Sequence, residues 1–228
     1  NKNTVLSLGG DQQQFIDEIS LNRVGYPLGT FYAVRWAGVD PATGAPQYLD
    51  KNGKVTTTYS TDNAVPLKAT WDPPYKGGAS LTVAYKRLEF SVLFSFIRGM
   101  SRLHFPYLYS HSADPNYRVY NQSVDMLKIW QHPGDRTDFQ GASYTRQIDS
   151  SDVRSSDYIK LRNLAINYEL HVGPSMGKYV RTIKLFAQGQ NLFSWMKWKG
   201  FDPEDANDIA QYEYPMPRTV TAGLNVSF

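Results

Sequence analysis

The stretch RTVTAGLNVSF, residues 218–228, alternates apolar and polar side chains along its whole length. Because successive side chains of a β-strand point to opposite faces, this pattern places two different surfaces on one strand. The apolar face carries Val220, Leu224, Val226 and Phe228. The polar face carries Thr219, Thr221 and Asn225. An unanchored terminus gains nothing from burying hydrocarbon, so the stretch predicts a strand that is anchored in a larger structure.

The composition favours a folded β-protein and excludes several other classes. Aromatic residues make up 14% of the 228 residues and charged residues 20%, a combination that suits strands and membrane interfaces. The net charge of +3 is not concentrated anywhere, so the sequence does not predict nucleic-acid binding. The absence of cysteine excludes disulfides and thiolate metal sites. The densest apolar run, residues 90–97, is far shorter than the roughly 18 residues of a spanning helix.

Period-two alternation recurs along the chain and predicts further strands. Residues 81–85 and 90–96 flank Lys86-Arg87 and indicate a tight β-hairpin, in which Val92, Phe94 and Phe96 share an apolar face. Other strands are predicted over residues 29–36, 157–170 and 180–192, the last with Gln188 and Gln190 on its polar face. In 157–170 the apolar phase slips, which predicts a β-bulge near Arg162-Asn163.

The connections between the predicted strands alternate between long and short. Counted from residue 29, the long ones cover about 37–77, 98–156 and 193–217, and the short ones are 86–87 and 171–179. Alternate connections of an up-and-down sheet lie on the same side, so all the long loops are expected at one end. Outer-membrane barrels have this asymmetry, with long extracellular loops and short periplasmic turns. Residues 9–28 do not fit this asymmetry. The same count places them on the periplasmic side, where connections are short, but the segment has about twenty residues.

These patterns predict an all-β, antiparallel up-and-down transmembrane β-barrel segment. An eleven-residue strand with a rise of about 3.3 Å per residue and a tilt of about 45° spans about 26 Å, close to an apolar band of about 25 Å. The apolar face of residues 220–228, with Val92, Phe94 and Phe96, is then expected to face lipid, and Phe228 to lie at the periplasmic interface. Thr219, Thr221, Asn225, Gln188 and Gln190 are expected to line a hydrated lumen. Periodicity alone leaves open a soluble β-sandwich with a dry core, which would be a glycan-binding module.

Five stretches resemble the C-terminal end of the SusC/RagA family, the TonB-dependent outer-membrane transporters of Bacteroidetes. They are GYPLGTFYAVRWAGVDPATGAPQYLDKNGKV (25–55), YKGGASLTVAYKRLEFSVLFSF (75–96), SSDYIKLRNLAINYEL (155–170), IKLFAQGQNLFSWMKWKGFDPE (183–204) and YPMPRTVTAGLNVSF (214–228). They cover well over half the chain and follow the order of the family. Within them, residues 36–41 and 198–203 share the pattern W-x-G-[VF]-D-P, which predicts the same turn after two different strands.

The resemblance implies a bacterial outer-membrane transporter that imports glycan fragments or peptides. The family forms a barrel of roughly 22 strands in lipid around a plug, is coupled to TonB, and is covered outside by a SusD-like surface lipoprotein. Six full strands are predicted here, and residues 1–8 resemble the end of a seventh. The resemblance therefore implies that residues 1–228 are the C-terminal part of such a receptor barrel. The plug, the TonB-interacting part and the remaining strands are then expected from another polypeptide, such as the upstream part of a cleaved protein or the product of a split gene. A related alternative is a SusC-like barrel that acts as a scaffold in a larger outer-membrane complex.

Candidate site residues are few, and each has a plain structural alternative. The loop aromatics Trp71, Tyr107, Tyr109, Trp130 and Tyr144 are candidates for stacking on sugar rings or contacting peptide, or for packing the loops. The acidic group Asp202, Glu204, Asp205 and Asp208 suggests a weak Ca²⁺ site, but a surface turn is favoured because the EF-hand pattern is not met. His104 and His111 share one loop and are interpreted as solvated residues rather than metal ligands. No catalytic, metal or cofactor motif is predicted.

Overall fold

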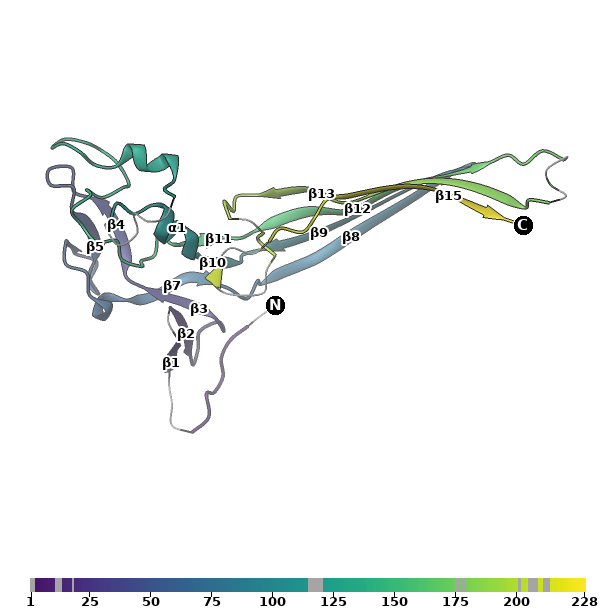
Figure 1. Cartoon of the computed structure of the whole chain (residues 1–228). Helices are drawn as coiled ribbons and strands as arrows, with labels where there is room; N and C mark the ends of the chain where they lie inside the picture. The colour runs from purple at the N-terminus through teal and green to yellow at the C-terminus, as the bar shows by residue number, and fades with distance from the viewer. Residues whose placement is uncertain are drawn as a thin grey trace. The chain divides into compact units, whose positions relative to one another are not determined.

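A computed structural model gives the fold, and it consists almost entirely of β-strands and loops (Figure 1). The structure describes residues 3–10, 14–17, 19–114, 121–174, 177, 179–200, 202–204, 209–210 and 214–228. The chain divides into two compact units. Unit 1 comprises Asn1–Pro74, Gly99–Ser156 and Lys199–Glu213, and unit 2 comprises Tyr75–Arg98, Asp157–Trp198 and Tyr214–Phe228. No described helix is both long and apolar enough to span a membrane.

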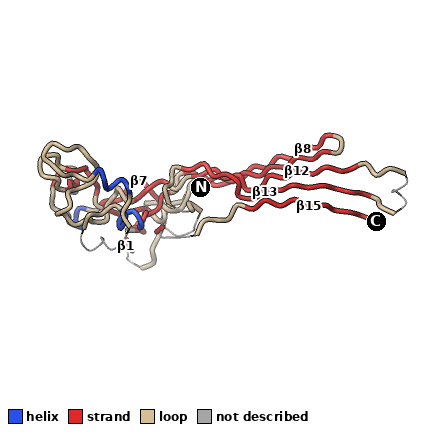
Figure 2. The backbone as a smooth tube through the Cα atoms, turned by 45° about the horizontal axis from the view of Figure 1, so that its top comes forward, coloured by secondary structure: helices blue, strands red, loops and turns tan. Residues whose placement is uncertain are grey.

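Unit 2 is one antiparallel sheet of long strands, which run side by side as red traces in Figure 2. Its strands are β8 (Tyr75–Tyr85), β9 (Leu88–Arg98), β12 (Tyr158–Leu170), β13 (Thr182–Met196) and β15 (Thr219–Ser227). The order across the sheet is β15-β13-β12-β9-β8, so the terminal strand forms one edge. The sheet confirms the prediction of antiparallel up-and-down strands.

Two local predictions for this sheet are confirmed. Tyr85 pairs with Leu88 across the turn, where Lys86 has a φ of +55°, so the hairpin closes over two residues. In β12 the register shifts between Leu161 and Asn163, which is the expected bulge. Leu161 lies opposite Phe94, and Leu164 lies opposite Val92. The bulge therefore keeps the apolar residues of both halves of β12 on one face.

The register gives the whole sheet one apolar and one polar face. Val92 pairs with Leu164, Leu164 with Gly189, and Gly189 with Val220, which continues the apolar face across four strands. On the other face Gln188 pairs with Thr221, Gln190 with Thr219, and Lys184 with Asn225. The apolar face is open to its surroundings, with Val220 77% and Leu224 55% exposed. The two residue sets predicted from alternation thus lie on opposite faces of one sheet.

The connections leave the sheet as the sequence predicts. Tyr75 pairs with Arg98, and Tyr158 pairs with both Ile97 and Met196, so these strand ends share one end of the sheet. From that end the chain continues into residues 99–157 and 197–218. The opposite end carries the short connections 86–87 and 171–181. The segments assigned to unit 1 are therefore the long connections of the sheet together with the chain before β8.

Three predictions for the N-terminal part are wrong. Residues 29–36 do not form a barrel strand but divide into β3 (Thr30–Ala33) and β4 (Arg35–Val39), which belong to different small sheets. The reason is packing, because Thr30 and Phe31 are both buried, whereas a barrel wall would expose one of two neighbouring residues. Residues 3–8 contain no strand. Residues 9–28 were expected on the periplasmic side because the connections were counted from a barrel strand over residues 29–36. This expectation is also wrong, since that barrel strand does not form.

The described residues of unit 1 form short sheets and a short helix. One sheet has the order β1 (Gln14–Asp17), β2 (Ser20–Arg23), β3, β7 (Val65–Thr70), and another has the order β4, β5 (Pro46–Leu49), β6 (Val55–Thr56). A third contains β11 (Val153–Ser155), β10 (Ser101–His104) and β14 (Ile209–Ala210). Helix α1 covers Phe105–Ser110, and 3-10 turns cover Thr61–Asn63 and Val124–Lys128. A buried cluster forms around Val34, Tyr48 and Ala64, with Trp36 and Tyr59 packed against it.

Candidate functional site

The loop segment around Ser150 is fastened to the aromatic cluster of unit 1. The Ser150 amide donates to the carbonyl of Val34 at 2.9 Å, and the Trp36 amide donates to Ser150 Oγ at 2.9 Å. The Tyr59 hydroxyl donates to the carbonyl of Ile148 at 2.8 Å. Because the bonds involve buried or half-buried core residues, they hold this loop in a defined position for the charged groups that flank it.

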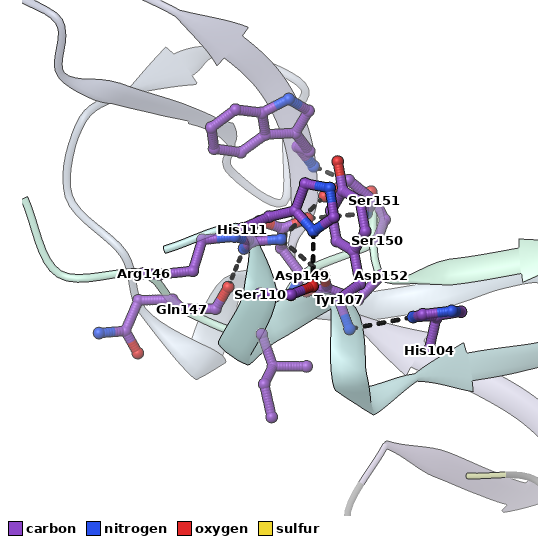
Figure 3. A network of polar contacts seen from close by, with 12 residues as sticks. His104, Tyr107, Ser110, His111, Arg146, Gln147, Asp149, Ser150, Ser151 and Asp152 are labelled. Carbon is purple, nitrogen blue, oxygen red and sulfur yellow. Dashed lines mark hydrogen bonds and ion pairs between the residues drawn. The ribbon is translucent and has the colours of Figure 1, made fainter. Parts of the chain in front are cut away.

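Those flanking groups form a buried ion cluster of Arg146, Asp149 and Asp152 (Figure 3). Arg146 donates from Nη1 to Asp149 Oδ2 at 2.8 Å and from Nη2 to Asp152 Oδ1 at 2.6 Å. The remaining carboxylate oxygens accept backbone amides, from Ser151 at 2.7 Å and from Asp149 at 3.0 Å. Buried charges need this degree of hydrogen bonding, since their desolvation otherwise exceeds the attraction between them.

The buried ion cluster binds a proton more readily than exposed carboxylates do. Burial raises the pKa of Asp152 to about 6, although Arg146 and the amide of Asp149 favour its charged form. The cluster therefore changes its charge near pH 6, well above the pH at which an exposed aspartate titrates.

Helix α1 begins directly after β10 and places an aromatic side chain beside the cluster. His104 caps the helix, with Nδ1 accepting the amide of Tyr107 at 3.0 Å, and Pro106 lies in the first turn, where no amide donor is needed. Burial lowers the pKa of His104 to about 4, so the imidazole is neutral at pH 7 and keeps its acceptor nitrogen. The cap fixes the position of Tyr107.

Tyr107 is the centre of a stacked group made of Arg154, Tyr107, His111 and Phe139. The rings of Tyr107 and His111 lie 3.8 Å apart with an interplanar angle of 20°, and His111 stacks on Phe139 at 5.7 Å. The guanidinium of Arg154 lies 4.1 Å from the centre of the Tyr107 ring, in the range of a cation–π contact. Aromatic and cationic surfaces are therefore combined in one place.

The stacked group and the ion cluster border a cleft of about 1560 Å³ within unit 1. A cleft of this size exceeds the roughly 300–1,000 Å³ of common small-molecule pockets. Its charged lining residues are five cations, Lys128, Arg136, Arg146, Arg154 and Lys199, and three carboxylates, Asp125, Asp135 and Asp138. The cleft thus has the size for an oligomeric ligand and more cations than carboxylates in its lining, with the charge of Arg146 balanced by Asp149 and Asp152.

Comparisons with known proteins agree with this architecture. No family model matches the chain. TonB-dependent receptors P3 and P26 of Formosa agariphila are 27% and 28% identical to it over 268 and 264 aligned positions, which cover all of this chain and 26% of each receptor. Structures of the RagAB peptide transporter and of the RagAB peptide importer in its open-open state align with TM-scores of 0.87 and 0.90 at 24% and 23% identity. These two alignments cover 95% and 99% of this chain and 25% of the matched chain.

The chain is thus similar to TonB-dependent receptors and to the RagAB transporter, in agreement with its resemblance to the SusC/RagA family. The chain spans about a quarter of the length of the relatives that it matches. The structural likeness shows that its sheet is a segment of a β-barrel, open at both edges within these residues. The TonB-dependent receptors and RagAB that it matches are outer-membrane proteins.

The loop aromatics of this chain have different surroundings. Tyr107 alone among the five candidates borders the cleft. Trp130 packs against Gly44 and Gly141 and donates from Nε1 to the carbonyl of Pro41 at 3.0 Å. Trp130 therefore fastens two loops together, which is the structural alternative considered for it.

The other three aromatic candidates also pack within unit 1. Tyr144 donates to the carbonyl of Thr43 at 3.3 Å. Tyr109 packs edge-on against Phe105, with ring centres 5.1 Å apart. Trp71 lies so close to Gly29 that a Cβ on this glycine would be 2.1 Å from Trp71 Nε1. We infer from these contacts that Trp71, Trp130 and Tyr144 organise the loops.

The acidic candidates are only partly described. Asp202 is buried, unlike a residue of the surface turn that the sequence favoured, and its Oδ1 accepts the amide of Glu204 at 2.9 Å. Asp205 and Asp208 lie outside the described residues. Asp40 accepts the amide of Ala42 in the same way at 3.0 Å. In each of the two W-x-G-[VF]-D-P segments, the aspartate side chain therefore accepts the amide two residues later and caps a turn. In the part of the chain that the structure describes, no three His, Cys, Asp or Glu residues gather as a metal site.

The interpretation of His104 and His111 as solvated loop residues is wrong. His104 is 8% exposed, the side chain of His111 is 10% exposed, and both contact Tyr107. Sequence reasoning also missed Arg146, Asp149 and Arg154, since no spacing motif marks charged residues that meet only after a loop folds. The one available signal was the dense mixture of Arg, Asp and Ser over residues 146–156.

Proposed function

We propose that this chain supplies barrel wall and outer loops to a TonB-dependent outer-membrane transporter that imports glycan fragments or peptides. The observation that carries the proposal is the two-faced sheet whose long connections all leave from one end and belong to a unit with a large cleft. The similarity to TonB-dependent receptors and to the RagAB structures supports it. The proposal assigns no catalytic step to the chain.

In this proposal the two faces of the sheet have separate tasks. Val92, Phe94, Phe96 and the apolar face of β15 contact lipid, and Phe228 anchors the end of the strand at the interface. Gln188, Gln190, Thr219, Thr221 and Asn225 hydrate the lumen through which the nutrient passes. The pairing of Gln188 with Thr221 and of Gln190 with Thr219 supports a continuous polar surface.

Two partners follow from the same proposal. A SusD-like surface lipoprotein covers the long-loop side and holds the nutrient, and TonB supplies energy through a plug encoded outside these residues. The relatives are about four times longer than this chain, which leaves room for a plug and the remaining strands. RagAB is a peptide transporter by name, which makes peptide the first substrate class to test.

Uptake in cells tests the proposal. The complete protein and its lipoprotein partner are expressed in a bacterial strain that has an outer membrane but lacks both proteins. Uptake of labelled peptides and oligosaccharides is measured with and without TonB. We expect uptake of one class that requires both the protein and TonB. Uptake that is unchanged without TonB, or a purified complex with assembly proteins and no transport, would favour the scaffold alternative.

A further inference from the structure

The cleft in unit 1 carries an arginine whose charge is not matched by a carboxylate. Arg154 on β11 lies directly opposite Arg102 on β10, and like charges directly opposite each other in a sheet are unfavourable. Arg102 is completely buried and donates to the carbonyl oxygens of Asp202 and Ile209. The pairing of β10 with β11 therefore brings the charges of Arg102 and Arg154 together. Of these two arginines, only Arg154 borders the cleft.

Arg154 has an aromatic partner in place of an acidic one. Among the described residues, no carboxylate forms an ion pair with its guanidinium, which instead lies over the ring of Tyr107. The nearby carboxylate of Asp152 already accepts bonds from Arg146 and from a backbone amide through its two oxygens. Stacking on Tyr107 holds the planar fork of Arg154 in one orientation, which lowers the entropy lost when it binds an anion.

The remaining charges of the cleft favour an anionic ligand as well. Asp125 bonds Lys128 at 2.9 Å and lies 3.6 Å from His111, and Asp135 accepts the amides of Gln131 and His132. These two carboxylates are occupied by protein groups, whereas the third lining carboxylate, Asp138, is exposed. Arg136 and Lys199 also line the cleft and are exposed, so they add positive potential around Arg154.

We propose that the cleft binds a carboxylate of the imported nutrient through Arg154, while Tyr107, His111 and Phe139 contact the apolar part of the ligand next to it. An arginine fork matches a carboxylate with two parallel hydrogen bonds, and aromatic rings suit the flat or apolar surface beside it. The carboxylate belongs either to a peptide or to an acidic sugar such as a uronate. This inference rests on the proposed import function, since it names the chemistry of the nutrient.

Matched probe pairs test the inference on the complete protein in detergent. Calorimetry compares the tripeptide Ala-Phe-Ala, which has a free carboxylate, with its C-terminal amide, and trigalacturonate with its methyl ester. We expect the acidic member of one pair to bind roughly tenfold or more tightly than its neutral counterpart, as a charged hydrogen bond implies. The pair that shows the preference identifies the source of the carboxylate.

Three variants make the result specific. Arg154→Met keeps the stem but removes the charge, so it should abolish the preference while binding of the neutral probe stays the same. Arg154→Lys should retain only part of the preference, because a lysine lacks the fork. Arg23→Met is the control, since Arg23 also stacks on a tyrosine, Tyr26 at 5.6 Å, but does not line the cleft. It should leave the preference intact.

The possible outcomes separate this inference from the proposed function. Equal or undetectable binding of both members of each pair, or a preference that persists in Arg154→Met, overturns the carboxylate site. TonB-dependent uptake would then still stand. Conversely, a carboxylate preference that requires Arg154 without any TonB-dependent uptake supports the site and overturns the import function.

Discussion

Nη2 of Arg146 lies 2.6 Å from Oδ1 of Asp152, and both side chains are almost completely excluded from solvent. The same guanidinium bonds Asp149 at 2.8 Å, so one cation holds two buried carboxylates. The Asp152 carbonyl also accepts the amide of His104, which joins the cluster to β10. The stability of the cleft wall therefore depends on the charge state of a few buried groups.

Replacing Arg146 should loosen this wall. Arg146→Met leaves two buried carboxylates without their cation, and breaking a buried pair in this way costs roughly 3–5 kcal/mol. Hydrogen exchange of the amides in β10 and β11 of the complete protein measures the effect. The triple variant Arg146→Met, Asp149→Asn, Asp152→Asn removes the unpaired charges and should recover much of the protection. Unchanged exchange in Arg146→Met would contradict a structural role for the cluster.

The pH dependence of unit 1 should contain two opposing contributions. The raised pKa of Asp152, about 6, means that its contribution to stability is present at low pH and is lost as pH rises from about 4 through 6. The lowered pKa of His104, about 4, means that its contribution is present above about pH 6.5 and is lost as pH falls towards 4. Burial also lowers the pKa of His111, which acts in the same direction as His104.

Variants separate these contributions. Asp152→Asn removes the first, so acidification from pH 6.5 to 4 should destabilise this variant more steeply than the wild type. His104→Asn removes part of the second and should change the slope in the opposite sense. The readout is hydrogen exchange of Ser101–His104, corrected for the intrinsic pH dependence of exchange. Parallel curves for the wild type and Asp152→Asn would show that Asp152 does not titrate in this range.

Gly29 should tolerate no side chain because Trp71 occupies the space. Its φ is +69°, and an added Cβ would lie 2.1 Å from Trp71 Nε1. Gly53→Ala is a matched control, since φ there is +83° with no atom within 4 Å, so it reports only the left-handed backbone cost of about 1–2 kcal/mol. Gly29→Ala should cost clearly more in thermal unfolding, and adding Trp71→Ala should remove the excess. Equal costs at the two glycines would argue against close packing of Trp71.

The two faces of β9 should respond differently to charge. Val92→Arg places a cation on the apolar face near the middle of the strand, where lipid contact implies a cost of about 2–4 kcal/mol. Ser91→Arg, one residue earlier, lies on the polar face and should have a small effect. The amount of folded protein in outer membranes and its resistance to denaturant compare the two variants. A larger effect of Ser91→Arg would reverse the assignment of the faces.

Local pattern was sufficient to predict the barrel segment. Alternation over 218–228 and 90–96, the two-residue turn at Lys86-Arg87 and the phase slip near Asn163 were each confirmed, because strand side chains alternate by local geometry. The contrast between long and short connections then indicated which strand ends lie together. Residues 29–36 were predicted incorrectly because an alternating stretch that is buried on both faces resembles a half-buried strand.

The cleft could be found only in the tertiary structure. Arg146, Asp149 and Asp152 lie close in sequence, but their burial depends on bonds to Val34, Trp36 and Tyr59, more than 80 positions away. The contact of Tyr107 with Arg154 likewise requires the pairing of β10 with β11. The alternating sequence was enough to define the faces of the strands, because that geometry is local. The positions and ionisation of the loop charges depend on long-range packing and desolvation, which local sequence does not encode.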